Sequence, residues 1–288
     1  MEKSTVTLQL FASGYCKAEA HIENPISGRG QARFYAVWAL WHIPEVGYVM
    51  FDTGYSPHFV EATRTFPERL YRWATPIVLA QGETAKEILA AQNILPTDIR
   101  YVIISHFHAD HISALRDFPQ ARFVCTKASL AEVQTLRGFS AVRKGILHKL
   151  LPTDFYERVI PIELLADSMT TTEEGLTLYA LFQNPHFQLV SLAGHARGML
   201  GFVYEQNGVF VLFGTDAAWS YETYQKNILP HRIVKLFFDS WQDFVQTQAR
   251  IRAFEKRNPH FEVLFTHCPK TLEKILACPP DGFRRIIA

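Results

Sequence analysis

Residues 100–111 of this 288-residue chain read RYVIISHFHADH, a short apolar segment followed by a cluster of histidines and an aspartate. Its first five residues are largely apolar and rich in branched side chains, which predicts a short buried strand. The residues that follow place three imidazoles and one carboxylate within six positions, at the carboxyl end of that strand. The stretch therefore predicts a strand that delivers metal-binding side chains to one edge of a sheet.

The spacing of these side chains favours metal binding over chance clustering on a loop. In extended backbone, residues two apart share a face, so His106 and His108 can hold one cation together. Asp110 and His111 fall where the chain turns into a helix, expected over residues 112–117, and can point toward a second cation beside the first. Imidazole combined with carboxylate suits zinc and its first-row neighbours, and an incomplete ligand set leaves room for water.

Three more residues of the same types follow predicted strand ends farther along the chain. His195 lies in AGHARG, a glycine-flanked turn that permits close backbone approach to an ion. Asp216 lies in GTDAA, directly after a strand predicted at residues 209–213. His267 follows a predicted strand at residues 262–265. Each candidate ligand thus lies just past a strand end.

Strand and helix patterns occur in both halves of the chain. Strands are predicted at residues 5–11, 32–40, 48–52, 123–125, 177–182, 188–192 and 201–205 besides those above, and a hairpin turn at Asn207-Gly208. Helices are predicted at residues 84–93, where Thr84 and Glu87 form a capping box, and at 127–136 and 240–256. Residues 137–161 are interpreted as a helical insertion, with Arg143, Lys144, His148 and Lys149 on its solvated face or on a lid.

Composition narrows the function classes. Hydrophobic residues make up 48%, enough for a sizeable core, and we expect residues 1–288 to form one domain. The charge balance is 29 − 28 = +1, so neither nucleic acid nor an anionic membrane is expected as partner, and a small-molecule substrate fits better. The four cysteines show no CxxC pair, and the N-terminus has no signal-peptide pattern, so a cytoplasmic location is expected.

The ordered set HxHxDH, Gly-His, Gly-x-Asp-Ala and a late strand-His resembles the metallo-β-lactamase superfamily. The resemblance extends over about residues 34–270 and includes residues 51–54 (FDTG), which look like the family's early Asp-Thr-Gly turn. It implies an α/β (α+β) fold, a four-layer αβ/βα sandwich with the metal site along one edge where strand ends of both sheets meet.

The same resemblance implies which residues hold which ion. His106, His108 and His195 would hold the first metal, Asp110, His111 and His267 the second, and Asp216 would bridge them. The cofactors expected are two divalent metal ions, zinc in the first place, with iron or manganese as alternatives. Asp52 is interpreted either as a buried carboxylate supporting the ligands or as a residue that only shapes its loop.

Such a site predicts a dinuclear metal-dependent hydrolase, in which a metal-bridging hydroxide attacks a small carbonyl ester. Asp110 is the candidate catalytic residue, orienting the hydroxide and carrying its proton to the leaving group. A lactonase-like activity leads, and a thioesterase of the glyoxalase II kind or a phosphodiesterase stays open. The non-hydrolytic alternative is a di-iron redox enzyme, and a binding module would be expected to have lost ligands.

The substrate side of the site differs from the lactonases that this chain resembles. Quorum-quenching N-acyl homoserine lactonases have a tyrosine three residues after the bridging aspartate, where this chain has Trp219. An indole can donate a hydrogen bond or wall a pocket, but it cannot act as a phenol. Trp219 and Tyr221 are the substrate-pocket candidates, with Tyr224 as a substitute, and further aromatic candidates are Phe34, Trp38, Trp41, Tyr55, Phe66, Tyr71 and Trp73. A homodimer is one expectation for the oligomeric state.

Overall fold

The computed structural model describes residues 8–206 and 208–277, and its strands form two sheets. The seven-stranded sheet has the order β4-β1-β2-β3-β5-β6-β7: β4 (Ile77–Val78), β1 (Gln9–Glu19), β2 (Gln31–Ile43), β3 (Gly47–Phe51), β5 (Ile99–Ile103), β6 (Arg122–Cys125) and β7 (Val159–Pro161). The six-stranded sheet has the order β13-β12-β11-β10-β9-β8: β13 (Glu262–Leu264), β12 (Val209–Phe213), β11 (Leu200–Gln206), β10 (Phe187–Ser191), β9 (Thr177–Ala180) and β8 (Ser168–Thr171).

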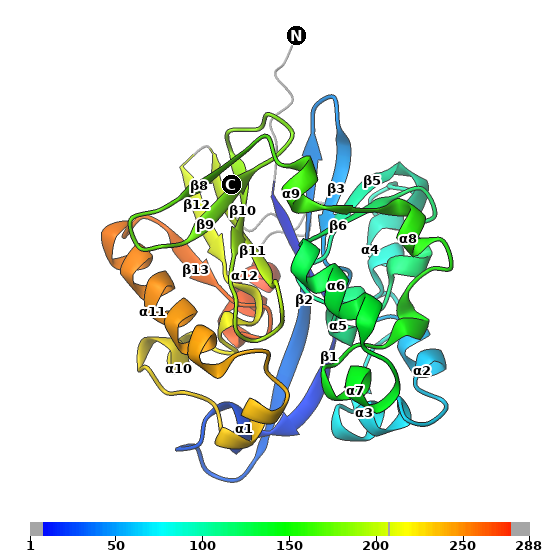
Figure 1. Ribbon diagram of the computed structural model, residues 1–288, viewed down its shortest axis with the longest axis vertical. Helices are drawn as coiled ribbons and strands as arrows, with labels where there is room; N and C mark the ends of the chain where they lie inside the picture. Colours follow the sequence, from blue (N-terminus) through cyan, green and yellow to red (C-terminus); the bar gives the residue numbers. More distant parts are fainter. Residues whose placement is uncertain (1–7, 207, 278–288) are drawn as a thin grey trace.

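Helices cover the outer face of each sheet, which makes four layers (Figure 1). The helices over the seven-stranded sheet are α2 (His58–Ala62), α3 (Arg69–Ala74), α4 (Ala85–Ala90), α5 (Ala109–Ile112), α6 (Lys127–Thr135), α7 (Gly138–Arg143) and α8 (Phe155–Arg158). Those over the six-stranded sheet are α10 (Tyr221–Gln225) and α11 (Trp241–Arg257). Short elements connect these layers: α1 (Ala20–Glu23), α9 (Ile162–Leu165) and the 3₁₀ turns η1 (Pro96–Asp98), η2 (Leu115–Asp117), η3 (His148–Leu150), η4 (Thr215–Ala217) and η5 (Arg232–Leu236). This arrangement confirms the predicted αβ/βα sandwich.

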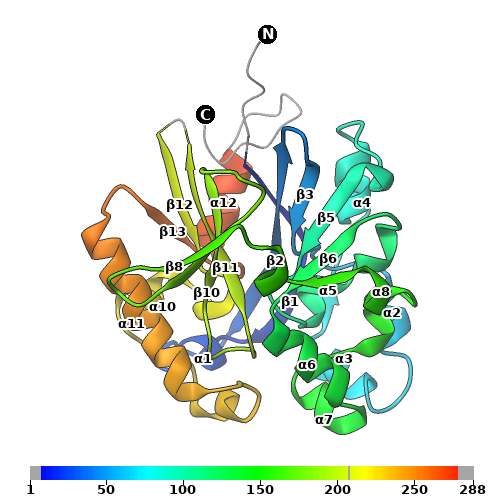
Figure 2. The ribbon, with the colours of Figure 1, turned by 45° about the horizontal axis from the view of Figure 1, so that its top comes forward.

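Alternation along each strand builds the layers. In β2, Val37, Ala39 and Trp41 face the other sheet, while Trp38 and Leu40 face the helices. Between the sheets, the Trp41 ring lies 4.5 Å from Phe187 and 4.9 Å from Phe202, measured between ring centroids. Figure 2 shows the two sheets side by side with the helical layers outside them. Large aromatic side chains therefore hold the two sheets together.

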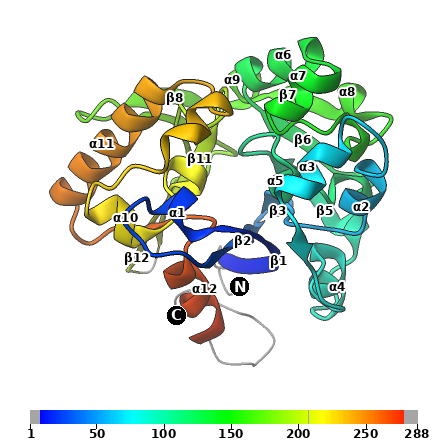
Figure 3. The same ribbon diagram turned by 90° about the horizontal axis from the view of Figure 1, so that it is seen from below.

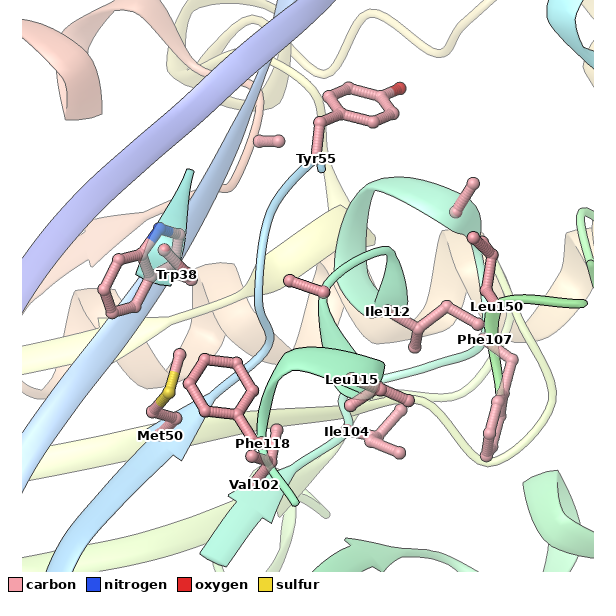
Figure 4. Close-up of a cluster of buried hydrophobic side chains, with 14 of the residues drawn as sticks. Trp38, Met50, Tyr55, Val102, Ile104, Phe107, Ile112, Leu115, Phe118 and Leu150 are labelled. Atoms are coloured by element: carbon pink, nitrogen blue, oxygen red, sulfur yellow. The ribbon is translucent and has the colours of Figure 1, made fainter. Parts of the chain in front are cut away.

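A second apolar cluster lies between the seven-stranded sheet and its helices. Met50 and Val102 project from β3 and β5 toward Ile112 of α5 and Leu115 of η2 (Figure 4). All four side chains are buried in this cluster. Burial of an apolar side chain of this size contributes about 1.5–3 kcal/mol. The loop between β5 and α5 is thus held in place by the core beneath it.

Several local predictions are confirmed and two need correction. Thr84 caps α4 in a capping box with Glu87, and Ser240 caps α11. In place of the helix expected over residues 112–117, the chain forms α5 at Ala109–Ile112, which contains both Asp110 and His111, and then the 3₁₀ turn η2. The apolar periodicity of the sequence does not predict α5, because its buried residues include polar side chains of the candidate metal site. Residues 137–161 are not wholly a helical insertion, because Val159–Pro161 forms β7 and pairs with β6. Residues 5–7 of the predicted first strand, Asn207 of the predicted hairpin and Cys278 lie outside the described residues.

The parallel strands position the site. β3, β5 and β6 pair in parallel within one sheet, and β12 and β13 pair in parallel within the other. Their carboxyl ends therefore lie at one edge of the sandwich, as expected for parallel strands. Seen from below, β1 and β2 run between the two helical layers, and α12 (Pro269–Ala277) packs against them (Figure 3). Among the described helices, none has the length and apolarity that a membrane crossing requires.

Candidate metal centre

The seven side chains predicted as ligands come together at the carboxyl ends of the strands. They form two groups: His106, His108, His195 and Asp216, and Asp110, His111, Asp216 and His267. Within each group, one ligand atom per residue lies within 4.8 Å of all the others. Asp216 belongs to both groups. All seven are buried except His108, which is half-buried. The two groups therefore adjoin through a shared carboxylate.

The first group converges on a point between two sheets. The Nε2 atom of His195 lies 3.0 Å from Nδ1 of His108 and 3.2 Å from Oδ2 of Asp216. Nε2 of His106 lies 3.8 Å from the same carboxylate oxygen. Two ligand atoms at zinc bonding distance on a tetrahedral ion are separated by about 3.3 Å. The spacing in this group is close to that value.

The second group has comparable spacing. Nε2 of His267 lies 2.9 Å from Oδ2 of Asp216 and 3.6 Å from Oδ2 of Asp110. Nε2 of His111 lies 3.4 Å from Asp110 Oδ2 and also 3.4 Å from Asp216 Oδ1. Oδ2 of Asp216 thus lies near imidazoles of both groups, and Oδ1 lies near His111 of the second group.

Buried polar atoms without partners show that these residues fit divalent ions. Nε2 of His106, Nε2 of His111 and Oδ1 of Asp216 are buried and have no hydrogen-bond partner within the described residues. Buried polar atoms in folded proteins are nearly always paired, because desolvation without a partner is costly. Lone pairs that converge on one point in this way are satisfied by a cation. Imidazole and carboxylate donors of this kind suit zinc and its first-row neighbours.

Neighbouring acceptors set the orientation of two of the imidazoles. Nδ1 of His111 donates to Oδ2 of Asp52 at 2.7 Å, and Nδ1 of His267 donates to the Tyr35 carbonyl at 2.8 Å. Both contacts leave Nε2 free toward the cluster. Acceptors behind histidine ligands commonly fix the ring and its tautomer. Of the two interpretations of Asp52, the structure therefore favours the carboxylate that supports a ligand.

Asp52 itself is held by the neighbouring loop. Its carboxylate accepts hydrogen bonds from the Ser105 backbone N–H at 2.8 Å and from the Ser105 hydroxyl at 2.7 Å. The side chain is fully buried, and its backbone φ of 60° lies in the left-handed region. Aspartate tolerates that region better than most residues. Asp52 thus ties the end of β3 to the beginning of the ligand loop.

Protonation differs between the two groups. Burial, with repulsion from neighbouring imidazoles, lowers the pKa of His106 well below its usual value and that of His108 to about 3, so both offer free lone pairs at neutral pH. Burial also opposes protonation of His111, but the surrounding carboxylates, Asp110 first, outweigh it and raise the pKa of His111 well above its usual value. Against the same effect of burial, Asp216 and Asp110 raise the pKa of His267.

This difference predicts the order in which ions leave on acidification. A bound metal needs neutral imidazole, so protons compete with it more strongly at His111 and His267. Between about pH 8 and about pH 6, the second group should lose its ion first. Zinc retained by a His108→Ala variant should therefore be released at higher pH than zinc retained by a His267→Ala variant, measured by dialysis and metal analysis. Release in the opposite order would contradict the prediction.

Asp110 is ionised in this environment. Although burial raises its pKa, the charges of His111 and His267 outweigh that effect and hold the pKa of Asp110 at about 2. Its carboxylate stands at the border of the cluster and is 7% exposed, slightly more than Asp216. An ionised carboxylate at the edge of a metal site can accept a proton from a water. The structure is thus compatible with the catalytic role predicted for it.

The substrate-pocket candidates lie in different surroundings. The Trp219 ring lies edge-on to His195 at 6.1 Å and to Phe34 at 5.5 Å, and its buried indole N–H has no partner within the described residues. The Tyr221 hydroxyl donates to Glu255 at 2.8 Å, and the Tyr224 hydroxyl donates to the same carboxylate at 2.9 Å. The structure therefore brings Trp219 to the cluster and commits both tyrosine hydroxyls to α11.

The other aromatic candidates are divided between core and surface. Phe34 contacts His267, with 5.3 Å between the ring centroids. Trp38 and Trp41 are fully buried in the apolar clusters on the two faces of β2, while Phe66 and Trp73 are exposed. Sequence reasoning missed Ser105 and the Tyr35 carbonyl. The position of Ser105 directly before HxHxDH could have indicated its role, whereas the role of a backbone carbonyl cannot be predicted from residue types.

Comparison with known proteins agrees with this geometry. The sequence model of the metallo-beta-lactamase superfamily matches residues 31–254. A curated relative, N-acyl homoserine lactonase AttM of Agrobacterium fabrum (strain C58 / ATCC 33970), is 22% identical over 182 residues. That match spans 63% of this chain and 63% of the relative's length.

Solved structures with this fold match nearly the whole chain. An N-acyl homoserine lactone hydrolase with the product N-hexanoyl-L-homoserine bound at its catalytic metal centre has a TM-score of 0.69 at 15% identity, covering 93% of this chain and 95% of that one. AidC, a dizinc quorum-quenching lactonase, has a TM-score of 0.62 at 14% identity, covering 93% and 89% of the two chains. Identities this low show a shared fold.

Proposed function

This chain belongs to the metallo-beta-lactamase superfamily, and from that premise we propose that it is a dinuclear metal-dependent hydrolase with a lactonase-like activity on small carbonyl esters. One observation carries the proposal: seven His and Asp side chains form two adjoining groups that share Asp216. The names of the relatives, several of which are lactonases, support the choice of ester class. A small-molecule substrate follows from the same comparison.

The residues divide the work of binding. His106, His108 and His195 would hold one ion, Asp110, His111 and His267 the other, with Asp216 between them. Zinc is the proposed metal, because the donor set is rich in imidazole and is completed by carboxylates. Divalent ions bound there supply a water of lowered pKa and polarise the carbonyl oxygen under attack.

The chain's own groups then handle the proton. The ionised Asp110 carboxylate accepts the proton of the attacking water and returns it to the alkoxide leaving group as the ester bond breaks. Asp52 and the Tyr35 carbonyl hold the rings of His111 and His267, so that both keep Nε2 directed at the cluster. The Trp219 indole N–H, adjacent to His195, is available to a substrate oxygen.

The test combines metal analysis with a panel of lactone, thioester and phosphodiester substrates. We expect about two zinc ions per chain and the fastest turnover on lactones. Asp110→Asn should lower turnover by about 10²–10⁴-fold, because it removes the proton acceptor. His108→Ala should lose one ion together with activity. Asp98→Asn, which changes an exposed carboxylate in η1, serves as the matched control.

Other outcomes would select the alternatives. Fastest turnover of the thioester would indicate a thioesterase of the glyoxalase II kind, and fastest turnover of the phosphodiester a phosphodiesterase. Two irons without hydrolysis would indicate a redox enzyme. A chain that binds no divalent metal would overturn the proposal altogether.

A further inference from the structure

The segment that follows α7 ends in a tight glycine turn. Gly145 has a φ of 71°, its N–H bonds to the Val142 carbonyl at 3.0 Å, and the Ile146 N–H bonds to the Ala141 carbonyl at 2.9 Å. These two hydrogen bonds form a Schellman motif, in which a left-handed residue ends the helix. Ile146 is buried beneath the turn. The position of Gly145 is thus fixed by the helix end and by the core.

This turn lies directly against a candidate metal ligand. A Cβ added to Gly145 would overlap the His108 ring and would lie 2.7 Å from its Nε2 atom. The opposite ring nitrogen, Nδ1, is the one that faces His195 at 3.0 Å. The backbone of Gly145 therefore packs on the outer side of the His108 imidazole and limits how far the ring can move away from the cluster.

The neighbouring residue reaches the other side of the same group. The Lys144 ammonium donates to the Phe238 carbonyl at 2.6 Å. The Phe238 ring is buried and lies edge-on to the His195 ring, with 4.8 Å between centroids. Next to it, the Asp239 N–H donates to the His195 carbonyl at 3.2 Å. Lys144 thus connects the turn after α7 to the segment that holds His195.

We propose that Lys144 and Gly145 are positioning residues that set the separation of His108 and His195, and so the metal affinity of the first group. His108 follows a strand of one sheet and His195 a strand of the other, and the two are 87 positions apart in the chain. Gly145 packs against His108, and Lys144 bonds to Phe238, whose ring contacts His195. The inference rests on the proposed dinuclear function and adds to it the part of the chain that tunes one of its two sites.

Gly145→Ala is the direct test, and Gly138→Ala is its matched control. Both glycines lie in the same segment with positive φ, 71° and 54°, so alanine introduces similar backbone strain at each. At Gly138 an added Cβ would meet no atom within 4 Å, whereas at Gly145 it meets His108. Displacing a group that orients a histidine ligand weakens metal binding by about 10–100-fold.

Zinc affinity of the metal-free proteins, measured by competition with a chromophoric chelator, gives the readout. We expect wild type and Gly138→Ala to bind two ions with similar affinities. Gly145→Ala should bind one of them at least about tenfold more weakly and approach the behaviour of His108→Ala. Its Co²⁺ absorption spectrum should change accordingly. Unfolding of both variants in chelator measures loss of stability separately from loss of metal affinity. Equal zinc affinities of the two alanine variants would overturn the inference.

Lys144 variants decide the matter if Gly145→Ala does not fold. Lys144→Met removes the hydrogen bond to Phe238 and should weaken the same ion severalfold, whereas Lys144→Arg keeps a donor and should restore its affinity. Unchanged zinc affinity of Lys144→Met would contradict the positioning role of Lys144 and Gly145 but not the proposed hydrolase function. A wild-type chain that binds fewer than two ions would contradict the proposed dinuclear function as well.

Discussion

Replacement of Asp216 by alanine is expected to remove both metal ions and to lower hydrolysis by at least about 10⁴-fold, which corresponds to about 5 kcal/mol. Asp216 is shared by the two ligand groups, with Oδ2 3.2 Å from Nε2 of His195 in the first group and Oδ1 3.4 Å from Nε2 of His111 in the second. Loss of both ions removes the water of lowered pKa and the polarised carbonyl together. Metal analysis and turnover of the best panel substrate measure the effect.

Asp98→Ala is a suitable control for this experiment. Asp98 is exposed and precedes β5, whereas the site lies past the opposite end of that strand. Unfolding in the presence of a chelator separates loss of metal from loss of fold. Retention of one tightly bound ion with substantial activity would show that Asp216 does not bridge the two groups.

Asp52→Ala is expected to lower the free energy of unfolding by about 3–5 kcal/mol even when metal is absent. The substitution removes, in a fully buried place, the carboxylate that accepts from the His111 Nδ1–H and from the backbone N–H and hydroxyl of Ser105. The Ser105 hydroxyl would keep only its contacts with the Nδ1 atoms of His106 and His111, at 3.0 and 3.2 Å. The substitution also places alanine at a φ of 60°, where a Cβ is strained. Denaturant unfolding in chelator measures the cost, and zinc titration should show weaker binding by the second group.

Asp52→Asn isolates the charge. Asparagine keeps one acceptor oxygen and tolerates the left-handed backbone, so its cost should be clearly smaller than that of alanine. If only the backbone conformation mattered, Asp52→Asn would be as stable as the wild type and only Asp52→Ala would be destabilised. An unchanged free energy of unfolding in Asp52→Ala would rule out the supporting role of this carboxylate.

Much of the fold was predictable because its signals are local. The capping box at Thr84 and the alternation along β2 both depend on residues close together in the chain. A helix was predicted over residues 112–117, whereas α5 spans Ala109–Ile112 and carries the candidate ligands Asp110 and His111. Helical periodicity does not report polar residues that are buried by a metal site rather than by a core.

The candidate site was predictable from the kinds of residue and their position after strands. β12 and β13 pair in parallel, and β10 runs in the same direction because both β10 and β12 pair antiparallel with β11. The residues that follow these strands, His195, Asp216 and His267, therefore lie at one edge of the sheet. Tyr221 shows the limit of that reasoning. Its distance of five residues from Asp216 suggested a place at the site, but α10 turns its hydroxyl toward Glu255 of α11.

Residue types alone were enough to predict the strands and the candidate metal ligands, because strand alternation and ligand chemistry are properties of residue types, while the layered sandwich was predicted from the resemblance to a known superfamily. The groups that orient the candidate ligands became evident only in the folded chain: the Tyr35 carbonyl behind His267, the Asp52 carboxylate behind His111, and the Gly145 backbone against His108. The physical reason is that these contacts join distant parts of the chain. Two of them are made by backbone atoms, which every residue carries and no sequence pattern distinguishes.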